Sequence, residues 1–96
     1  MGYKVIFAPQ ALARLEQVVT RIAEDNPGAA LNFGMRLVDH AHLLMDFPEL
    51  GRPYRRRANV RRLLCKPYFI YYRLRHNIRT VEILDYWHSA RLDPEL

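Results

Sequence analysis

Basic side chains gather in one stretch of this chain, residues 52–79. The stretch holds ten basic residues and no acidic one. They are Arg52, Arg55, Arg56, Arg57, Arg61, Arg62, Lys66, Arg73, Arg75 and Arg79. Guanidinium groups bind phosphates and carboxylates through paired hydrogen bonds, so the pattern predicts a cationic surface with a polyanionic partner. A nucleic acid, an acidic protein segment and a membrane surface are all candidates for that partner.

One histidine, His88, could transfer protons, because the unperturbed pKa of histidine lies near neutrality. Cleavage of an RNA strand requires a proton acceptor for the 2′-hydroxyl, a proton donor for the leaving oxygen and cations for the phosphate. His88 could act as both the proton acceptor and the proton donor. Arg61 or Arg62, together with Arg73, could stabilise the phosphate. The alternative is that His88 only anchors the end of the chain by a hydrogen bond.

Other side chains could bind a partner without taking part in catalysis. Tyr86 or Trp87 could stack on a base. The arginines that could bind a polyanion or a protein partner are Arg52, Arg55, Arg56, Arg57, Arg75, Arg79 and Arg91. For the run of three at positions 55–57, the alternative is a solvated loop.

Neither a metal site nor a reactive thiol is expected. The single cysteine, Cys65, alternates with apolar neighbours, which favours a buried, inert thiol over a nucleophile. His40 and His42 are two residues apart on an expected helix, so they do not face each other and cannot chelate a metal together. We therefore expect no cofactor. A lone cysteine excludes an internal disulfide and suits a reducing, cytoplasmic compartment.

The composition predicts a single folded domain spanning residues 1–96. Half of the residues are apolar, which is enough to build a packed core. No run of eighteen apolar residues is present, so no membrane span is expected. Residues 1–48 hold four basic and five acidic groups, whereas residues 49–96 hold eleven basic and five acidic. This asymmetry would steer an anion toward one side of the molecule.

The first half of the chain predicts a strand and a helical hairpin. Residues 3–7 read as a short strand, and residues 9–24 carry Leu12, Leu15, Val19 and Ile22 at helical spacing. Asn26 can cap a second helix over residues 27–47, with Pro27 at its first position. The apolar stripe of that helix is Ala30, Phe33, Leu37, Ala41 and Leu44, widened by Leu31, Met35, Val38 and Met45. The short link between the helices predicts an antiparallel pair.

The second half predicts strands. Residues 47–53 contain two prolines and a glycine and read as a turn-rich connector. Strands are expected at 60–66, 68–75 and 80–88, with a hairpin turn at 76–79 in which Asn77 is a residue that tolerates positive φ. Alternation in the last strand places Val81, Ile83, Asp85 and Trp87 on one face, and Glu82, Leu84, Tyr86 and His88 on the other. The expected fold is α+β: an N-terminal strand, an antiparallel two-helix hairpin and a three-stranded antiparallel meander in a small twisted sheet.

Six phrases of the sequence, in this order, resemble the RelE/ParE superfamily of toxins from type II toxin–antitoxin modules, the plasmid stabilisation type. They are residues 8–11 (APQA), 22–27 (IAEDNP), 47–53 (FPELGRP), 68–73 (YFIYYR), 81–84 (VEIL) and 87–91 (WHSAR). The resemblance covers nearly the whole chain. It implies a compact α+β toxin that forms a hetero-oligomer with a cognate antitoxin, which keeps it inactive.

The resemblance implies one of two targets. RelE-like members cleave messenger RNA on the ribosome, and several place a catalytic histidine at the position of His88; ParE-like members inhibit DNA gyrase. Lys66 is the only lysine beyond Lys4, and arginine exchanges protons poorly, so the sequence favours a gyrase inhibitor over a nuclease. A non-toxic basic binding module and a degraded toxin are the alternatives. An amphipathic, acidic antitoxin tail could cover exposed apolar surface, for which the candidates are Leu92, Leu96 and parts of the stripe of Leu31, Met35 and Val38.

Overall fold

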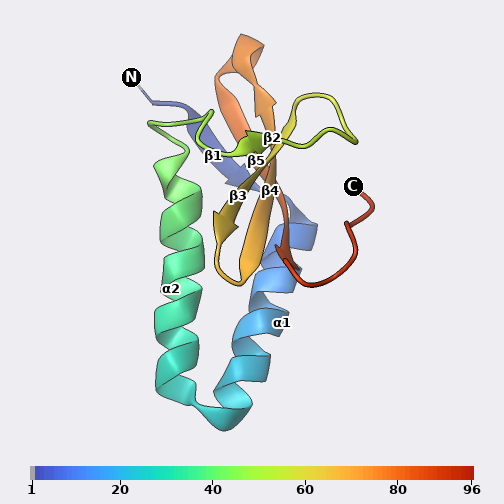
Figure 1. Ribbon diagram of the computed structural model, residues 1–96. Coiled ribbons are helices and arrows are strands. Elements are labelled where there is room, and N and C mark those ends of the chain that lie inside the picture. Colours follow the sequence, from blue (N-terminus) through green and yellow to red (C-terminus); the bar gives the residue numbers. More distant parts are fainter. Residues whose placement is uncertain (1) are drawn as a thin grey trace.

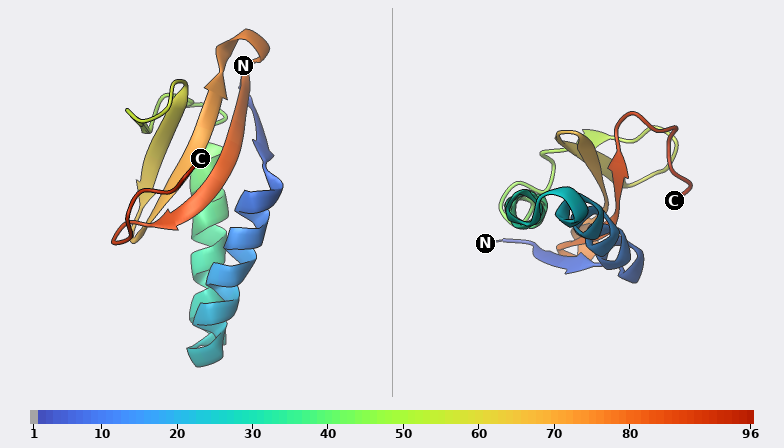
Figure 2. Two further views of the ribbon diagram at one scale, coloured as in Figure 1. Left: turned by 90° about the vertical axis from the view of Figure 1, so that its right-hand side faces the viewer. Right: turned by 90° about the horizontal axis from the view of Figure 1, so that it is seen from below.

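The structure is a computed structural model that describes residues 2–96. Its elements are β1 (Lys4–Phe7), α1 (Pro9–Asp25), α2 (Pro27–Leu43), β2 (Arg52–Pro53), β3 (Val60–Cys65), β4 (Tyr68–Arg75), the 3-10 helix η1 (His76–Ile78) and β5 (Thr80–His88). The helices run side by side, and their connecting turn projects beyond the sheet (Figure 1). They cover one face of the sheet, whereas the C-terminal tail lies on the other side (Figure 2). The predicted α+β class is confirmed.

Asn26 separates the two helices, as predicted. Its side-chain oxygen accepts a hydrogen bond from the Ala29 N–H at 3.1 Å, and its own N–H donates to the Ile22 carbonyl at 2.9 Å. One residue thus closes α1 and caps α2. The second helix ends at Leu43, earlier than the predicted residue 47. The chain turns there, and the Met45 carbonyl accepts a hydrogen bond from the Tyr3 N–H at 2.7 Å.

The sheet is mixed, with strand order β1-β5-β4-β3-β2. Strands β3, β4 and β5 form the predicted antiparallel meander, and β1 pairs with β5 in parallel. The sequence prediction missed β2, a two-residue edge strand inside the 47–53 connector that pairs with β3. Pro53 is compatible with such an edge position, because an edge strand has N–H groups that need no ladder partner.

One residue in β5 has no partner in β4. Ile83 lies opposite Tyr72, and Asp85 lies opposite Tyr71, so Leu84 is an extra residue between them. A bulge of this kind reverses the alternation of the side chains that follow it. The faces predicted for Tyr86, Trp87 and His88 are therefore wrong. Tyr86 joins the core under the helices, and Trp87 packs on the opposite face.

The main core lies between the helices and the sheet. The predicted stripe of α2 is confirmed, because Ala30, Leu37, Ala41 and Leu44 are buried. In α1 the buried residues are Ala11 and Val18, and Leu12 is 52% exposed, so the face predicted for α1 is rotated. A second, smaller cluster on the outer face contains Tyr54, Val60 and Tyr71, with Phe69, Leu84, Trp87 and Leu96 packed against it.

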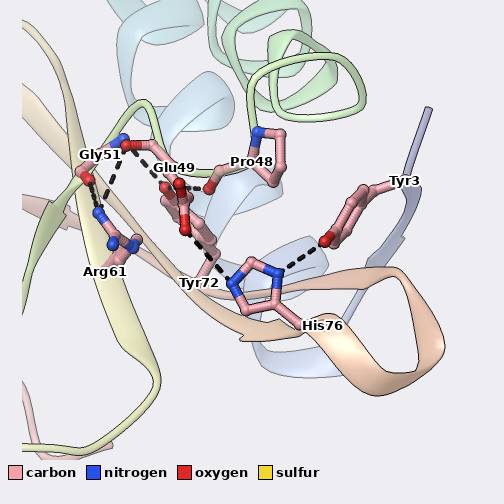
Figure 3. Close-up of polar contacts among 7 residues, drawn as sticks. All are labelled: Tyr3, Pro48, Glu49, Gly51, Arg61, Tyr72 and His76. Carbon is pink, nitrogen blue, oxygen red and sulfur yellow. Dashed lines mark hydrogen bonds and ion pairs between the residues drawn. The ribbon is translucent and has the colours of Figure 1, made fainter. Parts of the chain in front are cut away.

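The β4–β5 turn differs from its prediction in one detail. Arg79, and not Asn77, takes the left-handed conformation, with φ of 48°, because η1 occupies residues 76–78 and the chain reverses only after it. His76 in η1 forms a hydrogen bond of 2.6 Å between its Nδ1 and the Tyr3 hydroxyl. Its Nε2 lies 3.4 Å from the Glu49 carboxylate (Figure 3). These contacts tie the turn to both β1 and the connector.

The connector before β3 is held by the Tyr72 hydroxyl. It donates to the Pro48 carbonyl at 2.8 Å and accepts from the Gly51 N–H at 2.9 Å (Figure 3). Burial raises the pKa of Tyr72, so the hydroxyl keeps the proton that it donates. Gly51 has no room for a side chain, since a Cβ there would lie 2.8 Å from the Tyr72 hydroxyl oxygen and from the Arg62 carbonyl oxygen.

Tyr72→Phe is expected to lower the free energy of unfolding by about 1–3 kcal/mol, because it leaves the Gly51 N–H and the Pro48 carbonyl without their shared partner. Tyr54→Phe is the matched control. The Tyr54 hydroxyl is buried and has no hydrogen-bond partner among residues 2–96, so its loss should cost less than about 0.5 kcal/mol. Urea unfolding followed by circular dichroism measures both. Equal losses in the two variants would contradict the role of Tyr72 as a clamp.

Candidate polyanion and partner interface

Arg62 is the centre of a cluster on the outer face of the sheet. Its Nη1 donates to the Tyr71 hydroxyl at 3.2 Å. Its guanidinium carbon lies 4.2 Å from the centroid of the Phe69 ring and 5.8 Å from that of Tyr54. Cation–π contacts of this kind fix the guanidinium plane without neutralising its charge. Arg62 is therefore a preorganised cation on a half-exposed surface.

Part of the predicted cationic surface is present on this outer face. Arg52 lies directly opposite Arg62 in the β2–β3 pair. Arg73 lies opposite Val60 and Glu82, and Arg75 forms an ion pair with Glu82 at 3.7 Å. Like charges in directly opposed positions destabilise a sheet. The pair Arg52 and Arg62 is therefore a place where a bound anion would relieve repulsion.

The C-terminal tail lies across the same cluster. The Asp93 carboxylate is 3.6 Å from Arg62 and 3.6 Å from Arg56, and Leu96 packs against the aromatic side chains. The Trp87 indole N–H donates to the Leu92 carbonyl at 2.6 Å. The Arg56 and Asp93 side chains are 68% and 41% exposed, so the ion pairs contribute little to stability. They do demonstrate that the cluster accepts a carboxylate.

Several of the predicted binding arginines lie elsewhere. Arg61 faces the helix layer and donates to the Gly51 carbonyl at 2.7 Å and to the Glu49 carbonyl at 3.3 Å (Figure 3). It therefore fixes the connector. Arg79 stacks on the Tyr3 ring, with 4.9 Å from guanidinium carbon to centroid. Arg55 and Arg57 are exposed in the β2–β3 loop and line an open hollow of about 430 Å³.

His88 does not meet the arginines predicted to act with it. It lies opposite Tyr68 in the β4–β5 pair, on the face that the helices cover, and contacts the Tyr68 ring edge-on at 5.2 Å. Its Nδ1 accepts a hydrogen bond from the Ala90 N–H at 3.0 Å. Arg62 and Arg73 are on the outer face. The sheet therefore separates His88 from Arg62 and Arg73, whereas Arg61 lies on the helix side and is bound to the connector.

The two aromatic residues predicted to stack on bases have different surroundings. The Tyr86 ring is fully buried, and its hydroxyl donates to the Leu37 carbonyl at 3.1 Å. Burial also raises the pKa of Tyr86. The bulge at Leu84 turns this ring inward, so it cannot stack on a base. Trp87 is half-buried, and two guanidinium carbons lie over its ring, Arg14 at 4.9 Å and Arg91 at 4.4 Å.

A charged pair between α1 and β5 was not predicted from the sequence. The Arg14 Nε lies 3.1 Å from Oδ1 of Asp85, and Asp85 is 4% exposed. The same oxygen accepts the Tyr86 N–H at 2.8 Å. The signal for this pair was Asp85 itself, a carboxylate within an otherwise apolar strand face, because a buried charge requires a partner of opposite sign.

An apolar groove runs between α1 and α2. Its volume is about 410 Å³, and it is lined by Leu15, Val19, Ala30, Leu31, Gly34, Met35, Val38 and Asp39. Leu31 is 64% exposed and Met35 is 56% exposed. The groove exists because the helices approach closely at Gly34, where a Cβ would lie 2.9 Å from the Val19 methyl carbon. Such an exposed apolar surface is typical of a protein-binding site.

Cys65 is buried in the main core, as predicted. Burial raises the pKa of the thiol, and the Arg36 guanidinium, 3.8 Å from the sulfur, offsets part of this shift. No three metal-binding side chains come together within residues 2–96. No helix in the described part of the chain combines the length and the apolar character that crossing a bilayer requires.

The chain is similar to toxins of toxin–antitoxin systems. The family model described as "ParE toxin of type II toxin-antitoxin system, parDE" matches residues 5–93. "Putative toxin Y4kP" of Sinorhizobium fredii is 33% identical over 91% of this chain and 88% of its own length. A chain of the chromosomal ParDE system of P. aeruginosa superposes with a TM-score of 0.78 at 20% identity, over 90% of this chain and 95% of that one. A chain of the RelBE2 toxin–antitoxin complex of Mycobacterium tuberculosis has a TM-score of 0.63 at 27% identity, over 92% and 99% of the two chains.

The Cys65 thiol is expected to react slowly with a disulfide reagent in the native protein and rapidly after denaturation. Because its pKa is raised, the thiolate is scarce, and the native rate should increase only at a higher pH than for a free thiol. Absorbance of the released thiolate dye measures the rate. Arg36→Gln removes the group that lowers the pKa and should slow the native reaction further. A native rate equal to that of free cysteine would contradict an inert thiol.

Proposed function

Because the chain belongs to the ParE toxin family of type II toxin–antitoxin systems, we propose that it arrests growth by binding and inhibiting DNA gyrase, without cutting RNA. The observation that carries this proposal is the separation of His88 from Arg62 and Arg73 on opposite faces of the sheet. Binding requires a charged and shaped surface, which the outer face supplies, and does not require proton transfer at a fixed point.

RNA cleavage would place stronger demands on the same residues. The proton-transferring group and the phosphate-stabilising cations must reach one reacting phosphate within hydrogen-bond distance. His88 faces the helix layer and uses Nδ1 to hold the Ala90 N–H. Arg61 is occupied by two carbonyl groups of the connector. Arginines, which dominate the basic residues of this chain, bind phosphate well but exchange protons poorly.

A RelE-like, ribosome-dependent endonuclease is the second candidate function. The observation that favours it is the 27% identity to a chain of the RelBE2 complex over almost the whole of both chains. In that case the arginines of the outer face would hold the messenger RNA, and His88 would require a different set of neighbours from the predicted one.

The partner of such a toxin is its cognate antitoxin, and we assign the apolar groove between α1 and α2 to it. Leu31 and Met35 are exposed there although a monomer gains nothing from their exposure. An amphipathic helix or extended segment of the antitoxin would bury these side chains. Its acidic residues would pair with arginines of the toxin, because the chain carries a net charge of +5. The product is a toxin–antitoxin hetero-oligomer.

Purified protein is expected to inhibit DNA supercoiling by gyrase, and its expression without the antitoxin should arrest growth with no new messenger RNA ends. Gel electrophoresis of plasmid topoisomers measures the first effect, and sequencing of RNA 5′ ends measures the second. Intact supercoiling together with new RNA ends that disappear in His88→Ala would replace the gyrase proposal with the nuclease. Normal growth on expression would identify a degraded toxin.

Leu31→Glu and Met35→Glu are each expected to weaken antitoxin binding about 30-fold or more, because each places a charge in the centre of an apolar interface. The matched control is Leu92→Glu, since Leu92 is 91% exposed and lies outside the groove. It should change the affinity less than about twofold. Titration calorimetry with the antitoxin encoded beside the gene measures all three. Equal weakening by Leu92→Glu would contradict the assignment of the groove.

A further inference from the structure

We propose that a cavity between α1 and the end of β5 binds a terminal phosphoryl group, held by the guanidinium groups of Arg21 and Arg91 and by the Nε2–H of His88. The cavity has a volume of about 190 Å³. Since the share of one water in the liquid is about 30 Å³, a phosphoryl group and a few waters fit inside. The site lies beside α1 at the end of β5 and does not include Arg62 of the outer cluster. It does not depend on whether gyrase is the target.

The charged side chains that line this cavity are all arginines. Arg14, Arg21 and Arg91 contribute to its lining, and no acidic side chain among residues 2–96 does. The Asp85 carboxylate, which is 4% exposed, is paired with Arg14 and accepts a hydrogen bond from the Tyr86 N–H. Arg21 and Arg91 thus keep two positive charges for a ligand, which matches the charge of a phosphomonoester near neutral pH.

His88 supplies a directed donor to the same cavity, which it lines. Its Nδ1 accepts the Ala90 N–H, so the neutral ring carries its proton on Nε2 and donates from there. The edge-on contact with Tyr68, at 5.2 Å between centroids, holds the ring in place. The hydrogen bond from the Ala90 N–H argues against His88 as a proton shuttle. The same bond places the ring proton on Nε2, from which it can be donated to a ligand.

Arg91 is brought over the cavity by the turn that follows β5. The Arg91 N–H donates to the His88 carbonyl at 3.1 Å, which reverses the chain. The guanidinium then lies 4.4 Å above the Trp87 ring. A stacked guanidinium is already oriented, so it loses less conformational freedom when it binds a phosphate. Three donor groups from α1, β5 and the turn therefore converge on one small volume.

The cavity favours the end of a molecule over the middle of a strand. It is small, and its donors come from several directions, so a terminal phosphoryl group with three free oxygens can use all of them. A carboxylate has one negative charge, so it would neutralise only one of the two guanidinium groups. The source is either a free nucleotide or the 5′-phosphorylated end of a nucleic acid, and both present the same group.

The test uses the full-length protein with adenosine 5′-monophosphate, adenosine, and one oligonucleotide carrying either a 5′-phosphate or a 5′-hydroxyl. Calorimetry gives the affinities, and the NMR signals of the His88 ring report the place of binding. We expect the nucleotide to bind, adenosine not to bind, and the His88 signals to shift. Tighter binding of the 5′-phosphorylated oligonucleotide identifies a strand end as the source. Tighter binding of the nucleotide identifies a free ligand.

Arg21→Gln and Arg91→Gln should each weaken nucleotide binding about tenfold or more, because each removes a charge-assisted pair with the phosphate. Arg55→Gln is the matched control: Arg55 is exposed in a distant loop, and its substitution removes the same charge. It should weaken binding less than about twofold. Equal weakening in all three variants, equal binding of adenosine, or no binding of any phosphorylated probe at millimolar concentration would overturn the proposal. Circular dichroism verifies that each variant is folded.

Discussion

The extra residue at Leu84 determines which side chains at the end of β5 face the helices. Up to Ile83 the inward positions follow simple alternation, but after Leu84 the inward position falls on Tyr86. Tyr86 then fills the space under α2 and donates its hydroxyl to the Leu37 carbonyl. His88, two residues further, also lies on the helix side. Without the bulge, His88 would share the outer face with Arg62 and Arg73, so a single unpaired residue separates the histidine from the outer-face arginines that were predicted to act with it.

The bulge also explains a buried carboxylate that would otherwise be costly. A bulge leaves backbone groups without ladder partners, and a buried N–H without an acceptor is destabilising. Asp85 accepts the Tyr86 N–H at this point, and Arg14 of α1 supplies the compensating charge. Arg14 in turn lies over the Trp87 ring. The Arg14–Asp85 pair therefore connects the helix layer to the irregular part of the sheet, and it orients the first wall of the phosphoryl-binding cavity.

Local signals in the sequence predicted the features that depend on neighbouring residues. Asn26 is a cap because its side chain reaches an N–H three residues away, and the α2 stripe follows from helical spacing. Features that depend on pairing between distant segments were not predictable in the same way. Alternation alone cannot reveal that β5 has one residue more than β4, and with that residue the predicted faces of Tyr86, Trp87 and His88 were reversed. The sequence shows that the basic residues are concentrated in one stretch, but only the strand register separates Arg62, which faces outward, from Arg61, which holds the connector.

The outer face has the properties of a surface that binds an anion reversibly. Arg52 and Arg62 are directly opposed, which is unfavourable unless a negative group lies between or above them. In the isolated chain the Asp93 carboxylate of the tail lies 3.6 Å from Arg62 and 3.6 Å from Arg56, in contacts that are long and half-exposed. A stronger intramolecular pair would neutralise the cluster permanently, whereas a weak one can be exchanged for the carboxylate or phosphate of a partner at little cost. The aromatic rings around Arg62 keep its guanidinium in position during that exchange, because their cation–π contacts do not depend on which anion is bound.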